Sequence, residues 1–207
     1  PLGYSFEERV ACLGLLRETG YQVGTGVMIG LPGQTIAQLA SDILFFKEND
    51  IDMIGMGPYI PHHSAPLFQR PLDRSEDSRF KLGLNMIAAT RIVLKDVNIA
   101  ATTALQALKS DGREQGLKAG ANIIMPNVTG TEYRTGYQLY DNKPCMDENS
   151  EVCRENLAAG IKNIGETVIY DQWGDAKHFF KRKGLEYSHD STPVRQLSGQ
   201  KRRREQC

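Results

Sequence analysis

Four short segments of the sequence carry residue types that could bind a small molecule, and each follows an apolar run. The segments are Gly30-Leu-Pro-Gly33, Pro58 to His63, Thr102-Thr103 and Met125 to Asn127. They offer, in turn, backbone groups without side chains, an aromatic ring with two imidazoles, two hydroxyls, and a thioether beside an amide. Because a few polar groups among apolar side chains are typical of ligand pockets, these segments predict a pocket for an amphipathic small molecule rather than a highly charged one.

Three tyrosines follow these segments at close spacing, at positions 133, 137 and 140. A tyrosine combines an apolar ring with a hydroxyl that usually finds a hydrogen-bond partner when it is buried. Two interpretations of Tyr133, Tyr137 and Tyr140 stay open on this evidence. They form either a wall of the pocket or an ordinary packing cluster.

The candidates for metal or phosphate binding are weak. Cys145 and Cys153 are eight positions apart, which fits neither a zinc ribbon nor a redox C-x-x-C motif. His62 and His63 are adjacent, so their side chains point apart on an extended chain, and no acidic residue lies beside them. The sequence has no Gly-Lys-Ser/Thr phosphate loop. Taken alone, these residues favour isolated side chains over a metal site.

The hydrophobic pattern predicts the elements that position these segments. Strands are predicted at four short apolar runs, residues 23–29, 51–57, 98–103 and 122–125. Helices are predicted at residues 5–19, after Thr35, around Phe80 to Ile92, at 111–119 and at 152–164. This alternation predicts an α/β fold in which parallel strands, apolar on both faces, are joined by helices. The carboxyl ends of such strands share one edge of the sheet, where the four segments are expected to meet.

Composition narrows the class of protein further. The 207 residues include 25 basic and 25 acidic side chains, so the net charge is zero, which argues against a protein that coats nucleic acid. No apolar run approaches the roughly 18 residues that a membrane-spanning helix needs. Four scattered cysteines do not form a disulfide framework and favour a reducing compartment.

The two termini have different characters. The chain opens on Pro1-Leu-Gly-Tyr without a secretory signal pattern, which we interpret as the interior of a longer protein. Residues 188–207 are polar, contain the basic cluster at 201–204 and have almost nothing to bury, so they are predicted to be disordered. A role of this cluster in nuclear localisation or nucleic-acid binding is the less favoured interpretation.

Several strings, in this order, resemble the C-terminal half of radical S-adenosylmethionine enzymes of the [FeFe]-hydrogenase maturase (HydE) branch. They are Gly26 to Thr35, Gly55 to His63, Ala100 to Thr103, Ala121 to Asn127, and the Tyr-x-x-x-Tyr-Gln-Leu-Tyr string ending at Tyr140. The resemblance covers about Ser5 to Trp173. Biotin synthase and methylornithine synthase belong to the same larger group.

The resemblance implies a (β/α)8 TIM-barrel fold, of which this chain would supply the last four β/α units as a partial barrel. Residues 1–173 would form this half of the barrel, and residues 174–207 a C-terminal extension. The C-x-x-x-C-x-x-C loop that holds the family's [4Fe-4S] cluster is absent from this sequence. We therefore expect the chain to be inactive by itself.

The resemblance also assigns residues to the site. Positions that match the surroundings of the cofactor are Met53, Pro58, Ile60, Met125 and Tyr140. Positions that match the substrate cavity are Thr102, Thr103 and Tyr137. Cys145 and Cys153 fit the first two cysteines of an optional second cluster, but the third position is Asn156, which makes that cluster unexpected here.

The function implied by the resemblance is radical chemistry in assembly of the hydrogenase H-cluster. Its cofactors would be S-adenosylmethionine and a [4Fe-4S] cluster, and its substrate a small iron-cysteine precursor. Its partners would be other hydrogenase maturation proteins, without nucleic acid or membrane, in the cytoplasm or in an anaerobic organelle. The alternatives are a biotin-synthase-like or methylornithine-synthase-like enzyme, and a non-catalytic half-barrel scaffold.

Overall fold

The computed structural model describes residues 5–137, 149–170 and 172–185, together with residues 3, 140, 143, 144, 146 and 187. The side chains of Thr135 and Tyr137 are not described. The predicted disordered tail at 188–207, with its basic cluster, and Cys145 also lie outside the described residues.

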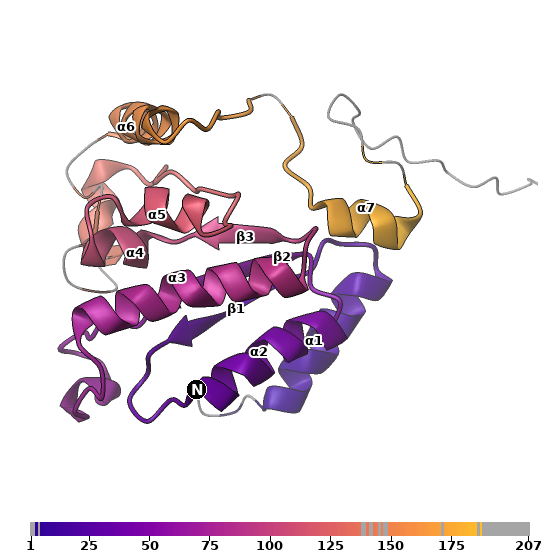
Figure 1. The fold of residues 1–207 in the computed structure, drawn as a ribbon, viewed down its shortest axis with the longest axis horizontal. Helices are drawn as coiled ribbons and strands as arrows, with labels where there is room; N and C mark the ends of the chain where they lie inside the picture. Colours follow the sequence, from indigo (N-terminus) through magenta and orange to yellow (C-terminus); the bar gives the residue numbers. More distant parts are fainter. Residues whose placement is uncertain are drawn as a thin grey trace, which may run out of the picture.

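A parallel three-stranded sheet forms the centre of the fold (Figure 1). Its strands are β1 (Gly24–Ile29), β2 (Met53–Pro58) and β3 (Asn98–Ala101), in the spatial order β1-β2-β3. Gly26 lies in register with Gly55, and Gly55 with Ala100. The predicted α/β class with parallel strands is therefore confirmed.

Helices connect the strands and continue after the sheet. They are α1 (Phe6–Glu18), α2 (Ile36–Glu48), α3 (Glu76–Val93), α4 (Thr103–Leu108), α5 (Gly112–Lys118), α6 (Ser150–Asn163) and α7 (Lys177–Lys183). Two 3-10 helices are η1 (Pro66–Gln69) and η2 (Thr131–Tyr137). The predicted capping boxes at Ser5 and Thr35 open α1 and α2 with both reciprocal hydrogen bonds.

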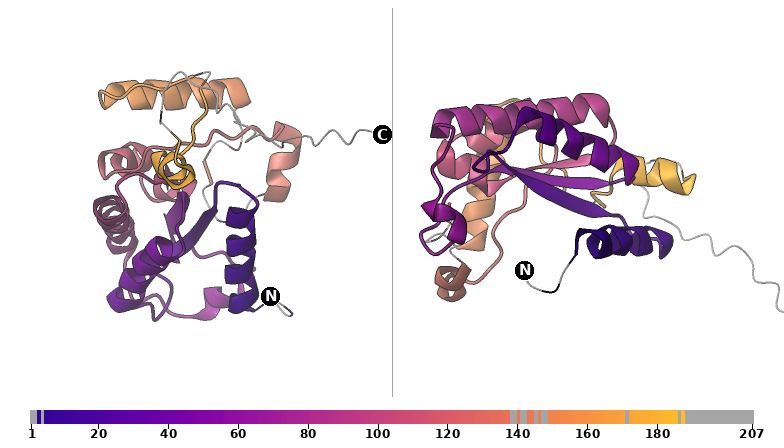
Figure 2. Two further views of the ribbon diagram at one scale, coloured as in Figure 1. Left: turned by 90° about the vertical axis from the view of Figure 1, so that its right-hand side faces the viewer. Right: turned by 90° about the horizontal axis from the view of Figure 1, so that it is seen from below.

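The hydrophobic core lies on one face of the sheet, beneath α2 to α5. Ile54 and Met56 of β2 point into it and are fully buried, as are Phe46 of α2 and Leu105 of α4. Figure 2 shows α2 and α3 together on this side of the sheet, with α1 on the other side of β1. Side chains alternate along a strand, so the remaining residues of β1 and β2 belong to the opposite face.

That opposite face corrects the prediction that every strand is buried on both sides. Gly24, Gly26 and Met28 of β1 are exposed, and 54% of the Met28 surface is accessible. Of the three described strands, β3 alone is buried along its whole length. In the described part of the chain, the helices α2 to α5 cover only one face of the sheet. On the opposite face, Gly24 and Gly26 have no side chains that could cover the backbone.

The predicted fourth strand is reduced to one parallel bridge between Ala100 and Ile123. The side chain of Asn122 explains the interruption, because its Oδ1 accepts a hydrogen bond from the Ile99 N–H at 2.8 Å. In a regular parallel ladder, a backbone carbonyl would accept that hydrogen bond. The Ile123 carbonyl still accepts from the Ala101 N–H, so this segment lies beside β3 without continuing the ladder.

The third strand ends earlier than predicted. β3 stops at Ala101, Thr102 is the N-cap of α4, and Thr103 is its first residue. α4 itself was not predicted, because its six residues are too few to show a helical period. The predicted helix at 111–119 is confirmed as α5, which ends before Gly120 at φ 119°.

α7 was missed as well, and it packs against the amino ends of the strands. Its N-terminal neighbour Ala176 and its own Phe180 are buried. The buried carboxylate of Asp52, which precedes β2, accepts hydrogen bonds from His178 and Arg182 of this helix and from the Val23 N–H. The sequence of α7 is polar because it is rich in charged residues. The hydrogen bonds of His178 and Arg182 to Asp52 hold it against the amino ends of the strands. None of the described helices has the length and the apolar character that spanning a membrane would require.

Candidate functional site

The carboxyl ends of the three strands are joined by hydrogen bonds across the edge of the sheet. The Tyr59 N–H, just after β2, donates to the Ile29 carbonyl at the end of β1 at 2.7 Å. The Thr102 hydroxyl, just after β3, donates to the Met56 carbonyl of β2 at 3.3 Å. The predicted convergence of the strand-end segments at one edge is therefore present for these three connections.

Gly57 permits the close approach of Thr102 to β2. A Cβ atom at Gly57 would lie 2.8 Å from the Thr102 Oγ1 and 3.3 Å from the Cβ of Ala104. Real Cβ contacts are not that short, so a larger residue would displace the start of α4. The absence of a side chain at Gly57 thus places the hydroxyl of Thr102 at the edge of the sheet.

Thr103 and Tyr140 form the most direct contact between predicted site residues. The Thr103 Oγ1 lies 2.5 Å from the phenolic oxygen of Tyr140, although the two residues are 37 positions apart in the sequence. Both side chains are partly buried. The Tyr140 hydroxyl therefore reaches back from the segment after η2 to the first residue of α4.

The environment of Tyr140 keeps its phenol protonated. Burial raises the pKa of Tyr140, while the hydrogen bond to Thr103 and the positive charge of Arg113 act in the opposite direction. Because burial is the largest of these effects, the hydroxyl stays neutral at physiological pH. The Thr103–Tyr140 pair can therefore donate and accept hydrogen bonds but supplies no negative charge.

The backbone N–H groups of the glycine loop after β1 already donate to side chains of the protein. This corrects the expectation that they are free to bind a ligand. The side-chain oxygen of Gln34 accepts from the Gly30 N–H at 2.6 Å and from the Leu31 N–H at 3.3 Å. The Gly33 N–H donates to the carboxylate of Asp73 at 2.6 Å. Gly30 itself has φ 81°, a conformation that glycine adopts readily.

The rings of the two adjacent histidines stack on each other, and in the described part of the chain they do not belong to a group of candidate metal ligands. The rings of His62 and His63 stack with centroids 4.4 Å apart, and the His62 Nδ1 accepts from the Ser64 N–H. Their rings lie side by side, so the expectation that they point apart was wrong. Among the described residues, no group of three or more His, Cys, Asp or Glu side chains could hold a metal ion.

Two of the remaining cofactor candidates, Met53 and Pro58, do not face the Thr103–Tyr140 pair. Met53 is half-buried at the amino end of β2, in register with Gly24 and Asn98. Pro58 is buried on the helix side, where its ring lies near Gly83 of α3. Met53 therefore lies at the opposite end of the strand from the carboxyl edge, and the side chain of Pro58 is directed toward the core.

Ile60 and Met125 lie beyond the strand ends. Ile60 is partly buried and packs against the hydrophobic core. Met125 follows the Ile123 bridge and has 58% of its surface exposed. Cys153 is fully buried in α6, so of the two candidate cluster cysteines the structure describes only one, and it places that one inside the fold.

Buried arginines are the residues that the sequence interpretation missed. Arg134 is 1% exposed, and its Nε donates to the Thr129 carbonyl at 2.8 Å, which holds the turn before η2. Arg113 is 2% exposed in the first turn of α5. An arginine in a short polar helix normally lies on the solvated face, so neither position gave a signal in the sequence.

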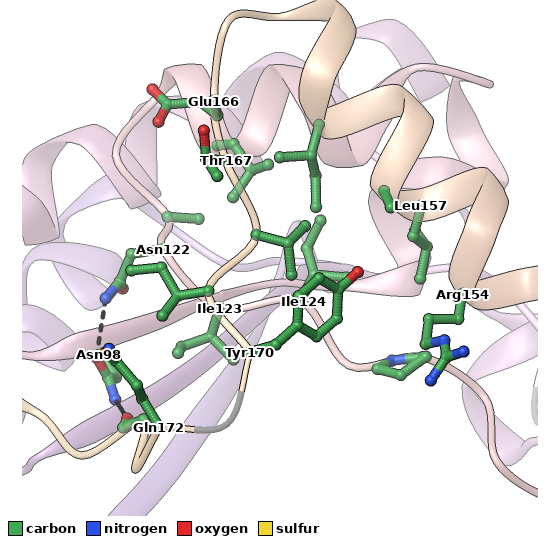
Figure 3. Close-up of a pocket in the computed structure, with 18 of the residues that line it drawn as sticks. Asn98, Asn122, Ile123, Ile124, Arg154, Leu157, Glu166, Thr167, Tyr170 and Gln172 are labelled. Carbon is green, nitrogen blue, oxygen red and sulfur yellow. Dashed lines mark hydrogen bonds between the residues drawn. The ribbon is translucent and has the colours of Figure 1, made fainter. Parts of the chain in front are cut away.

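A separate cavity of about 680 Å³ lies between α6, the chain after it and the Ile123 segment (Figure 3). Its wall includes Ile123, Leu157 and Tyr170, with Arg154 and Glu166 among the polar residues. Asn98 and Asn122 are joined by a 2.8 Å hydrogen bond at its side (Figure 3). Of the four predicted segments, it includes only Pro126, so it is distinct from the carboxyl-edge site.

Comparison with solved structures supports the fold. The chain is similar to methylornithine synthase PylB, with a TM-score of 0.62 over 81% of this chain and 47% of that one. The sequence identity is 22%, so this likeness concerns the fold, which is an α/β fold with a parallel sheet. No protein-family model matches the chain.

Comparison with curated sequences gives a more specific relative. The chain is 46% identical over 177 residues to the [FeFe] hydrogenase maturase subunit HydE of Thermotoga maritima. The aligned part covers 86% of this chain and 49% of that protein, so the chain spans about half the length of the relative it matches. The chain is therefore HydE-like, and the resemblance predicted from its strand-end motifs is confirmed.

Proposed function

We propose that this chain is part of a radical S-adenosylmethionine enzyme that acts in assembly of the [FeFe]-hydrogenase H-cluster. The observation that carries the proposal is the 46% identity to HydE over 177 residues. In this proposal the described sheet and helices belong to the last four units of a (β/α)8 barrel. The small-molecule substrate, the other maturation proteins as partners, and a cytoplasmic or organellar location are parts of the same proposal.

We assign the carboxyl edge of the sheet to the binding of S-adenosylmethionine and the substrate. Ile60, which packs against the core beneath this edge, is assigned to the apolar surroundings of the cofactor, and the paired hydroxyls of Thr103 and Tyr140 suit a polar group of the substrate beside it. Met53 and Pro58 are assigned to the barrel interior and to support of the edge, respectively, since they lie away from the hydroxyl pair. When bound, S-adenosylmethionine and a reduced [4Fe-4S] cluster supply a 5′-deoxyadenosyl radical.

The described residues do not fit the cluster itself. They contain no group of three candidate metal ligands, and Cys153 is buried in α6. The proposal therefore assigns the cluster ligands to residues outside the described part, and no step of the reaction is derived from this chain's cysteines.

The contribution of this chain is to orient the ligand and to limit side reactions. Thr102 and Thr103 are fixed at the edge by the Met56 carbonyl and by Tyr140. The pair presents neutral hydroxyls, because burial holds the pKa of Tyr140 above its ordinary value. Fixed neutral groups can align a substrate without placing a strong acid beside a reactive intermediate.

The test uses the full-length protein that carries this sequence, reconstituted anaerobically with iron and sulfide. Reduction with dithionite in the presence of S-adenosylmethionine is expected to yield 5′-deoxyadenosine. A Thr103→Val variant is expected to lose substrate turnover more than cofactor cleavage. Well-reconstituted protein that forms no 5′-deoxyadenosine would contradict the proposal.

A further inference from the structure

Arg113 is a buried cation without a described counter-charge. The residue is 2% exposed, and its Nε and Nη1 atoms have no hydrogen-bond partner. No ion pair to its guanidinium occurs within the described part of the chain. Because a buried charge without a partner is strongly unfavourable, such a group normally has a ligand or an acidic neighbour.

Helix geometry directs Arg113 toward the carboxyl edge of the sheet. α5 begins beside the Leu105 backbone, beyond the end of β3, and the chain after it returns to Ile99. Gly116 packs on β3, since a Cβ at this position would lie 3.3 Å from the Cβ of Ala101. Arg113 is one turn earlier on the same face of the helix, so its side chain lies over the region just past Ala101.

The Thr103–Tyr140 pair occupies that region. Thr103 is two residues after Ala101, and its hydroxyl contacts the phenol of Tyr140. The positive charge of Arg113 also acts on Tyr140, although burial has the larger effect and the pKa of the phenol is raised overall. A guanidinium and two neutral hydroxyls are therefore grouped at one corner of the edge.

We infer that Arg113 is an anion-binding residue, whose guanidinium binds the carboxylate of a small molecule held against Thr103 and Tyr140. A guanidinium donates two parallel N–H groups to a carboxylate, and the hydroxyls can donate to the same oxygens. A carboxylate also carries a single negative charge, which matches the single buried positive charge. A phosphate dianion would leave one charge unbalanced.

The inference stands on the burial and direction of Arg113, and it goes beyond the proposed radical reaction. It is therefore tested by equilibrium binding, which needs neither the cluster nor S-adenosylmethionine. A failure of the radical proposal would leave the binding result unchanged, and the reverse also holds.

The experiment measures thermal unfolding of the full-length protein in acetate, inorganic phosphate and chloride at equal ionic strength. Acetate is expected to raise the melting temperature in a saturable way, because a ligand that binds the native state stabilises it. Arg113→Met is expected to weaken acetate binding about tenfold or more, since charged hydrogen bonds are lost. The same variant is expected to raise the melting temperature in chloride, because it removes an uncompensated buried charge.

Arg91→Met is the matched control. Arg91 is a partly buried arginine whose guanidinium donates to the carbonyls of Gly120 and Val97 at 2.8 Å. This variant should lower the melting temperature in chloride and keep the acetate response. Arg113→Lys keeps the charge without the planar pair of donors, and it should weaken the acetate response even if Arg113→Met does not fold.

Three results would overturn the inference. An acetate response that persists in both Arg113 variants would show that the anion binds elsewhere. Stronger stabilisation by phosphate than by acetate would contradict a carboxylate ligand. A fall in melting temperature for Arg113→Met in chloride, with no acetate response in the wild type, would show that a carboxylate of the protein itself pairs with Arg113.

Discussion

At the amino ends of the strands, the buried carboxylate of Asp52 accepts hydrogen bonds from Val23, His178 and Arg182. On the carboxyl side, the buried guanidinium of Arg113 has two nitrogen atoms, Nε and Nη1, whose N–H groups donate to no described residue. The two groups are about equally buried, at 0% and 2% exposure. The difference separates an amino edge whose buried charge is paired within the protein from a carboxyl edge whose buried charge, in our inference, binds a ligand.

Asp52→Ala should have the largest effect on this comparison. The substitution removes the shared acceptor and leaves Arg182 and His178 of α7 without it. We expect the free energy of unfolding to fall by about 3 to 5 kcal/mol, the usual cost of breaking a buried ion pair. Urea unfolding monitored by circular dichroism measures this change. A loss below about 1 kcal/mol, as for a surface pair, would contradict the structural role of the amino edge.

Gly57→Ala should have the second largest effect, because the new Cβ would lie 2.8 Å from the Thr102 hydroxyl. We expect a loss of about 1 to 3 kcal/mol, the range for an overpacked position. Gly55→Ala in the same strand is the matched control, since no atom lies within 4 Å of the added Cβ. Equal losses in the two variants would show that strand geometry, rather than the approach of Thr102, requires glycine at Gly57.

Thr103→Val should have a smaller effect on stability, about 0.5 to 1.5 kcal/mol for one hydrogen bond. The pKa of Tyr140 should rise further, because the hydrogen bond from Thr103 lowers it in the wild type. The phenolate absorbance of this variant, compared with Tyr140→Phe, measures that shift. An unchanged midpoint would argue against the contact between the two hydroxyls.

The same phenol gives a prediction for pH. Its folded-state pKa is raised above the unfolded value near 10, so the folded protein holds this proton more tightly. The stability from this group is present below about pH 10 and is lost as the pH rises through the folded pKa. Tyr140→Phe should remove this part of the alkaline decline, while Tyr133→Phe, at an exposed ring, should leave it unchanged.

Lys181→Ala should have the smallest effect on the free energy of unfolding, although it also removes an ion pair, with Asp96, at the amino ends of the strands. The Lys181 ammonium bonds the carboxylate of Asp96, and this interaction lowers the pKa of Asp96. Its side chain is 68% exposed, so we expect a loss below about 1 kcal/mol. A loss as large as that of Asp52→Ala would show that exposure does not separate the two pairs.

The sequence predicted the framework well where periodicity is strong. The capping boxes at Ser5 and Thr35 and the three parallel strands have local signals, and all are present. α4 and α7 were missed because six or seven residues show little period, and α7 is stabilised by partners such as Asp52 that lie far away in the sequence. The fourth strand failed at Asn122, whose side chain replaces a backbone acceptor.

Some of the predicted site residues meet in the structure, and others do not. Thr103 and Tyr140 came from the resemblance to HydE, and the structure brings their hydroxyls into contact. Arg113 had no signal, because its burial results from the packing of α5 on β3 rather than from its neighbours in the sequence. Met53 lies at the amino end of β2, away from the hydroxyl pair at the carboxyl edge, and this separation depends on strand register.

The position of β1 has a practical consequence for handling this polypeptide. Within the described sheet, β1 has one neighbouring strand, so its other edge presents backbone N–H and C=O groups over Gly24–Ile29. Such an edge can act as a template on which a second molecule pairs, and this six-residue segment carries no charged side chain to oppose it. In the proposed barrel, a strand of the full-length protein would pair with this edge, so the isolated 207-residue polypeptide should self-associate more readily than the full-length protein. Thr25→Lys should reduce that self-association.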